Sequence, residues 1–237
     1  MNENNYNYVE GYFLCSNVGS KYNPFGANAS ENAKWSVEFE SVKMSHSGKL
    51  AEHLDSNSDG WRVSVNSDHH PVVYWSKDSS HRGSYTFDSL TVPWDTWTYI
   101  RFRVQISVTN PTIRCYVGSM TQDVQVQGRW NTNTDCNLQI GGNYTTIRGT
   151  VTVKGYPYNS DILGTATFDM DSLSVGATTA TVNGDTYTIS SAVRNSAGVR
   201  VKYNGEWKNG TLYAKVNGEW KYGQVYAKVN GTWKEGT

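Results

Sequence analysis

The sequence predicts an all-β protein, an antiparallel β-sandwich followed by a small C-terminal array of β-hairpins. No stretch has the apolar spacing of an amphipathic helix, and strand-like runs follow one another at intervals typical of a sandwich. Residues 199–237 repeat one 13-residue unit three times, which indicates a small supersecondary unit stacked on itself. With 237 residues, the chain is long enough for one large β domain and a short appendage.

The large domain is predicted to span residues 1–190. Its clearest strands, read from apolar–polar alternation bounded by turn residues, are 34–42, 61–65, 72–76, 84–87, 97–107, 112–117, 124–126, 137–140, 150–153 and 163–169. Two further alternating runs, 178–182 and 186–189, flank Asn183-Gly184 and predict a hairpin. Residues 191–198 are small and polar, so we expect them to form a linker.

Alternation along the strands separates a dry face from a polar face. The dry face is predicted to carry Trp35, Val37, Phe39, Trp61, Val63, Val65, Ile100, Phe102, Val104, Ile106, Ile113, Cys115 and Val117. The opposite face is predicted to carry Ser36, Glu38, Glu40, Arg62, Ser64, Asn66, Tyr99, Arg101, Arg103, Gln105, Arg114 and Tyr116. The second face is therefore polar, rich in arginine and dotted with tyrosine.

The C-terminal repeats each predict one tight hairpin, because Asn-Gly readily takes the positive φ angles that such a turn requires. The turns are Asn204-Gly205, Asn217-Gly218 and Asn230-Gly231. Trp207, Trp220 and Trp233 recur at one offset, and we expect them to pack on tyrosine and valine of neighbouring units. A lone two-stranded hairpin is barely stable, so the units should need stacking or a partner chain. They contain no His and no Cys, which favours a structural or attachment role.

Charge and hydropathy exclude two classes of partner. Lys plus Arg and Asp plus Glu are both 21, so the chain lacks the basic excess of a nucleic-acid binder. No apolar run approaches the ~20 residues of a membrane helix.

The three cysteines, Cys15, Cys115 and Cys136, are odd in number and lack metal-like spacing, which argues against a disulfide framework. The N-terminus lacks the layout of a secretory signal, so folding in a reducing cytosol is expected.

Five segments, in order, resemble the concanavalin A-like (laminin-G-like) jelly-roll superfamily. They are WSVEFE at 35–40, GWRVSV at 60–65, WTYIRFRV at 97–104, CYVGS at 115–119 and LQIGG at 138–142. The fourth resembles a Tyr-Val-(Asn/Asp)-Gly turn of the family but lacks its Asn. The resemblance covers roughly residues 8 to 170 and implies a jelly-roll sandwich, the fold of many lectin-like domains.

The C-terminal units resemble Asn-Gly-x-Trp-Lys repeats at the ends of tail, fibre and other virion proteins of bacteriophages. That resemblance covers residues 199–237. Together the two resemblances imply a non-enzymatic virion protein, of tail-fibre, baseplate or receptor-binding type, that assembles in the bacterial cytoplasm and acts outside the cell. Its implied partners are a bacterial cell-surface glycan and other virion proteins, and a homotrimer is expected by analogy with phage fibres.

Glu38 and Glu40 raise the question of catalysis. Residues i and i+2 on one strand face lie about 6.5–7 Å apart, near the carboxylate separation of inverting glycosidases. Hydrolases of the same superfamily carry Glu-x-Asp-x-(x)-Glu, whereas here the middle Asp is replaced by Glu40 and the last Glu is absent. The structural alternative is that these acids pair with Arg101, Arg103 or Arg62 on neighbouring strands.

Acidic and histidine-containing turns are candidate metal sites. Asp161, Asp169 and Asp171 could offer oxygens to calcium, as could the loop at 55–59, but neither has the spacing of a known loop motif. Turn carboxylates more often bond their own backbone, so no resident cofactor is expected. His69-His70, with His53 and His81, lack the partners of a zinc tetrahedron, and a solvated turn is expected for the pair.

Carbohydrate binding needs an aromatic platform with fixed polar groups nearby. The candidate platforms are Trp94, Trp130, Tyr99 and Tyr116, and the candidate hydrogen-bonding groups are Arg62, Arg101, Arg103 and Asn143. Trp75 and Trp97 are expected to pack in the core. Two other functions stay open: a capsid decoration or head fibre with a purely structural role, and a polysaccharide hydrolase.

Overall fold

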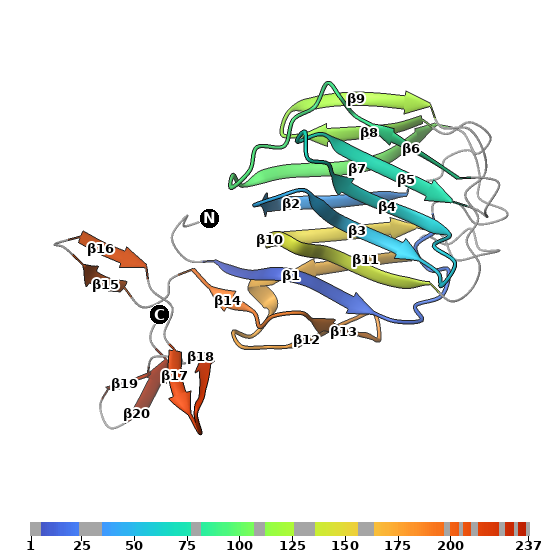
Figure 1. The fold of residues 1–237 in the computed structure, drawn as a ribbon. Helices are drawn as coiled ribbons and strands as arrows, with labels where there is room; N and C mark the ends of the chain where they lie inside the picture. The colour runs from blue at the N-terminus through green and yellow to red at the C-terminus, as the bar shows by residue number, and fades with distance from the viewer. Residues whose placement is uncertain are drawn as a thin grey trace.

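The computed structural model describes residues 6–23, 35–76, 82–106, 112–125, 136–155, 164–196, 200–203, 206–209, 213–222, 226–229 and 232–235. Within these ranges the protein is all-β, as predicted, with antiparallel strands and one short 3-10 turn, η1 (Met170–Ser172) (Figure 1). In the same ranges, none of the helices has the length and apolarity needed to cross a bilayer.

The large domain is one 14-stranded sheet. Its main path runs β6–β5–β4–β3–β10–β2–β7–β8–β9. The bounds are β2 (Ser36–Met44), β3 (Gly48–Leu54), β4 (Gly60–Val65), β5 (Pro71–Ser76), β6 (Arg82–Thr86), β7 (Thr98–Ile106), β8 (Thr112–Val117), β9 (Met120–Gln125) and β10 (Asn137–Gly155). Beside this path lie β1 (Asn7–Cys15), β11 (Gly164–Asp169), β12 (Thr179–Val182), β13 (Asp185–Ile189) and β14 (Arg194–Asn195).

Strand β10 joins the two arms of the sheet. Its first residues, 137–140, pair with β3, and residues 145–154 pair with β2, while β1 and β11 line its other edge. Between the two paired parts, Gly141 has a φ of +90° and its α-carbon faces the carbonyl oxygen of Gly11. This close approach of two backbones lets the strand bend without leaving the sheet.

The sheet curls until its two arms face each other, as in a nearly closed barrel. In Figure 1, β3, β4 and β5 lie in front of β2 and β7. Trp35 meets Trp61 edge-on with ring centroids 5.2 Å apart, and Phe87 meets Phe102 at 5.9 Å. The edge strands meet through side chains, since Gln122 on β9 donates to Asp88 after β6 at 3.0 Å.

The predicted dry face is confirmed at every residue whose side chain is described. All are at most 3% exposed, including the two core tryptophans and Cys115. The polar face is confirmed except at Ser36, which is buried. Ser36 lies in register between Arg103 and Lys154, so its short side chain sits between two long ones. The side chains of Gln105 and Ile106 lie outside the described residues.

Three features of the domain differ from the prediction. Strands β1 and β3 are additional, and β10 unites two predicted strands into one. The expected linker 191–198 begins inside the domain, because β14 pairs with β1 and Val193 is fully buried. The small polar residues there misled the prediction: Ser191 donates its hydroxyl to the Glu10 carbonyl, so polar side chains fasten this segment to β1.

Each C-terminal unit forms an antiparallel strand pair. The pairs are β15 (Arg200–Tyr203) with β16 (Glu206–Asn209), β17 (Tyr213–Val216) with β18 (Glu219–Tyr222), and β19 (Tyr226–Val229) with β20 (Thr232–Glu235). Asn217 and Gly218 have φ angles of +53° and +87°, as a tight Asn-Gly turn requires. The other two turns, Asn204-Gly205 and Asn230-Gly231, and the side chains of Trp207, Trp220 and Trp233 lie outside the described residues.

Candidate functional site

The outer face of β2, β7 and β8 brings together three predicted ligand-binding residues. Tyr99 donates its hydroxyl to Glu38 Oε1 at 3.0 Å, and Arg101 Nε lies 3.2 Å from Glu38 Oε2. The Arg101 guanidinium carbon is 5.8 Å from the Tyr116 ring centre. Burial and the bond to Glu38 raise the pKa of Tyr99 above its usual value. Both oxygens of Glu38 are therefore engaged within the protein, although Arg101 Nε is buried and makes no hydrogen bond with a described residue.

On the same face, Glu40 and Arg114 are bound to other groups of the protein, whereas Arg103 is not ion-paired. Glu40 Oε2 accepts the Thr150 backbone N–H at 2.9 Å. Of the two acids, Glu38 therefore forms the expected ion pair with an arginine, and Glu40 binds the backbone of β10 instead. Arg114 holds Asp123 through two bonds of 2.6 and 2.7 Å, which lower the pKa of that carboxyl. Arg103 is half-buried and forms no ion pair with any described residue.

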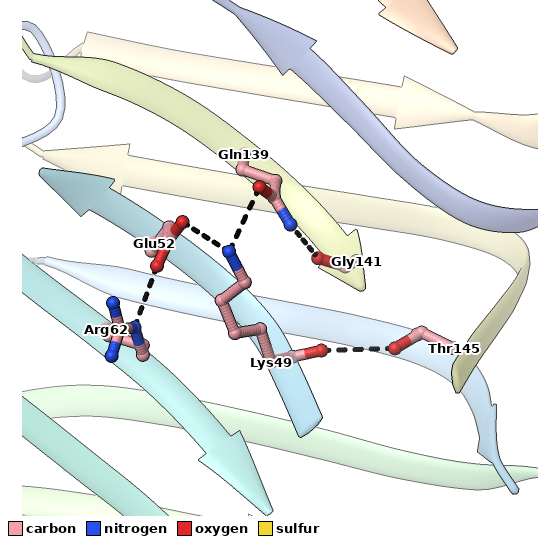
Figure 2. Close-up of polar contacts among 6 residues, drawn as sticks. All are labelled: Lys49, Glu52, Arg62, Gln139, Gly141 and Thr145. Atoms are coloured by element: carbon pink, nitrogen blue, oxygen red, sulfur yellow. Dashed lines mark hydrogen bonds and ion pairs between the residues drawn. The ribbon is translucent and has the colours of Figure 1, made fainter. Parts of the chain in front are cut away.

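Arg62 belongs to a different cluster, on β3, β4 and β10 (Figure 2). Its Nε lies 2.7 Å from Glu52 Oε2, and Lys49 Nζ lies 2.6 Å from Glu52 Oε1. Lys49 also donates to Gln139 Oε1 at 3.2 Å, and Gln139 donates to the Gly141 carbonyl at 2.9 Å. The network ties β3 and β4 to the bend in β10. Grouping Arg62 with Arg101 was wrong, because alternation assigns a face but not an arm of the curled sheet.

Four aromatic side chains meet at one end of the domain, and we call them the Trp94 rim: His46, His69, Trp94 and Tyr144. The His69 ring stacks on Trp94 with centroids 4.1 Å apart, and His46 lies nearly parallel to Trp94 at 6.5 Å. His46 also contacts Tyr144, with ring centroids 5.3 Å apart. Tyr144 lies on β10, and the other three rings come from separate turns and loops of the chain, so only the fold assembles them.

The rim combines a fixed base with an exposed edge. Trp94 is half-buried against the core, and the Asp95 backbone N–H donates to the Met44 carbonyl at 2.8 Å, which fixes this loop on β2. Tyr144 is 52% exposed, its chain neighbour Asn143 is exposed, and so is Asp95, the residue after Trp94. An accessible aromatic ring with amide and carboxylate groups close by can stack on a sugar and bond its hydroxyls.

No protein-family model and no curated protein matches this sequence.

Of the predicted platforms, Trp94 lies in the rim, whereas Tyr99 and Tyr116 lie on β7 and β8. Trp130 falls outside the described residues. Sequence reasoning missed Tyr144 and the two histidines as platform residues. The weak signal for Tyr144 was its place beside Asn143, which had been singled out for its amide. Trp75 packs against the core as expected, whereas Trp97 is half-exposed and contacts Arg148 and Lys43 instead.

The candidate calcium ligands are occupied by backbone groups. Asp169 Oδ1 accepts the Asp171 N–H at 3.0 Å, and Asp171 Oδ1 accepts the Asn7 N–H at 2.8 Å. Asp55 Oδ1 likewise accepts two N–H groups of its own loop. Within the described ranges no three His, Cys, Asp or Glu side chains form a group able to hold a metal; Asp161 and His81 lie outside those ranges.

The histidine pair does not form a solvated turn. His69 and His70 are half-buried, and their Nδ1 atoms lie 3.1 Å from the Val92 carbonyl and 2.7 Å from the Leu90 carbonyl. The expectation was wrong because the loop after β6 folds back over this turn. All three cysteines are buried and free, and burial raises the pKa of the Cys115 thiol well above its usual value.

Proposed function

We propose that the chain is a non-enzymatic virion protein of a bacteriophage that recognises bacterial surface carbohydrate. We further propose that its curled sheet is a jelly-roll sandwich of the concanavalin A-like type. The observation that carries the binding function is the Trp94 rim, where His46 links the half-exposed Tyr144 to Trp94 and where Asn143 and Asp95, their neighbours in the chain, are exposed.

The rim suits a sugar because it is rigid at its base and polar at its edge. The stack of His69 on Trp94, at 4.1 Å, and the Asp95 bond to Met44 hold the platform in place before any ligand arrives. Preorganisation of this kind lowers the entropic cost of binding. An exposed tyrosine ring offers the apolar face that C–H groups of a sugar need, and neighbouring amide and carboxylate groups supply hydrogen bonds.

The engagement of both candidate carboxylates supports a function without catalysis. The two oxygens of Glu38 are held by Tyr99 and Arg101, and Glu40 is bound to the backbone of β10. Glycoside hydrolysis needs two carboxyl groups facing the scissile bond, one as acid and one as base or nucleophile. Here each acid faces another part of the protein.

The C-terminal strand pairs supply the proposed attachment to other virion proteins. Each pair is short, and in the β17–β18 pair the side chains of Lys215, Asn217 and Glu219 are exposed. Short hairpins of this kind are stable when they pack on partners, which fits a homo-oligomer such as a trimer. Several copies on one particle would turn modest affinity per rim into firm adhesion.

Replacing Tyr144 with alanine is expected to weaken binding to a wall polysaccharide about tenfold, because the stacking surface is lost. Met120→Ala is the matched control, since Met120 is equally exposed, at 51%, but lies on β9. Glycans from bacterial cell walls on an array, followed by titration of the best binder, provide the measurement. Absence of binding to every wall glycan would instead favour a structural role such as capsid decoration.

A further inference from the structure

A second group of aromatic and cationic side chains lies on the outer face of β2 and β10, and we call it the Trp97 patch: Tyr6, Lys43, Trp97 and Arg148. The Arg148 guanidinium carbon lies 4.4 Å from the Trp97 ring centre and 4.7 Å from the Tyr6 ring centre. Lys43 Nζ lies 5.3 Å from the same Trp97 ring. One indole therefore holds two positive charges. The patch shares no residue with the Trp94 rim.

The strands fix these groups in place. Ser41 and Arg148 are opposite each other on β2 and β10, and Arg148 Nε donates to Ser41 Oγ at 3.0 Å. Lys43 lies two residues further along β2, on the same side of the sheet. Tyr6 meets Trp97 edge-on at 5.8 Å, and the Arg148 guanidinium lies against both rings.

Neither cation of the patch has a carboxylate partner among the described residues. Six other cations there do form ion pairs: Lys21, Lys49, Arg62, Arg101, Arg114 and Arg194. The two acids nearest in register are turned elsewhere, since Glu10 pairs with Arg194 at 2.6 Å and Glu40 binds the Thr150 N–H at 2.9 Å. Two like charges on one ring repel each other, and an anion placed between them would remove that cost.

We propose that the Trp97 patch binds the oxyanion groups, carboxylate or phosphate, of an acidic polysaccharide. Arginine recognises such groups through paired N–H bonds, and lysine adds a point charge. The proposal goes beyond the Trp94 rim, because it adds a second site and a charge requirement. Nucleic acid fits less well: the guanidinium already covers Trp97 and Tyr6, which a base would need for stacking, and the chain has no net positive charge.

The test measures binding of three immobilised polymers: polygalacturonate, poly(glycerol phosphate) and neutral dextran. The wild-type protein is expected to bind the two acidic polymers, more weakly as salt rises, and to bind dextran far less. Lys43→Gln is expected to lower acidic-polymer binding about tenfold, because one charge-assisted contact is lost. Lys154→Gln is the matched control, since Lys154 lies on the same face of β10 without a described ion pair, and its binding should match wild type.

Three further measurements complete the test. Among the described residues, the Lys43 ammonium contacts the Trp97 ring and forms no ion pair, so Lys43→Gln should keep the wild-type melting temperature, which separates lost binding from lost folding. Neutral wall glycans should bind Lys43→Gln as tightly as wild type, so failure at the patch is distinguished from failure at the rim. The proposal is overturned by equal binding to dextran, by no binding to either acidic polymer, by unchanged binding in Lys43→Gln, or by tighter binding of a single-stranded oligonucleotide of equal charge.

Discussion

Gly141→Ala is expected to destabilise the β domain by about 3 kcal/mol or more. The position has a φ of +90°, where a side chain is already strained, and an added Cβ would lie 2.2 Å from the Gly11 carbonyl oxygen. Gly11 cannot move away cheaply, because its carbonyl oxygen belongs to the backbone of β1, which is paired with β10. The bend that joins the arms of the sheet would open.

Gly118→Ala separates the strain of a positive φ from the steric clash with Gly11. Gly118 also has a positive φ, +58°, but no atom lies within 4 Å of its added Cβ. Substitution of Gly118 should therefore lower the free energy of unfolding only through the strained backbone, by about 1 kcal/mol. Chemical denaturation of both variants gives the two free energies of unfolding. Equal losses would show that backbone strain alone governs Gly141 and that the contact with Gly11 does not matter.

The alternation of apolar and polar residues was sufficient for the class of fold and for the core. Val37, Phe39 and Phe102 are buried because a strand with one wet face must place every second residue inside. The same rule overlooked β3, where Leu50 and Ala51 are adjacent and buried and a bulge interrupts the register after Lys49. It also divided β10, because a bend at Gly141 breaks the alternation without ending the strand.

The candidate sites depended on distances that sequence spacing does not encode. Arg62 and Arg101 both point to the outer side of their strands, yet they lie on different arms of the sheet. Arg62 pairs with Glu52, and Arg101 pairs with Glu38. The Trp94 rim draws on segments far apart in the chain, with Tyr144 on β10, so no local pattern indicated Tyr144. Trp97 resembled a core residue because it leads an apolar strand, but it precedes the first paired residue and remains at the surface.

His53 is expected to make the domain sensitive to acid. The side chain is fully buried, and burial lowers its pKa from 6.5 to about 4. Its Nε2–H donates to the Gly19 carbonyl at 2.9 Å, and its ring lies between Tyr22 and Trp61. Nδ1 has no hydrogen-bond partner among the described residues, so no group described in this part of the core would stabilise a second proton.

The direction of the effect follows from which state binds the proton. Below pH 6.5 the unfolded chain protonates His53 while the folded protein does not, so the free energy of unfolding falls as the pH falls. The loss continues until the pH reaches about 4, where the folded form also takes up the proton. Over that window the contribution of His53 amounts to about 3 kcal/mol. Above pH 6.5 it is constant.

His53→Gln isolates this contribution, because the glutamine amide can still donate to the Gly19 carbonyl but does not titrate. The variant should be less stable than wild type at neutral pH, since it packs less well between Tyr22 and Trp61. Its stability should fall less steeply between pH 6.5 and 4, by about 3 kcal/mol over the range. Denaturant unfolding at a series of pH values measures both slopes. Parallel curves for the two proteins would show that His53 is protonated in the folded state and that its burial does not control the acid limit of this domain.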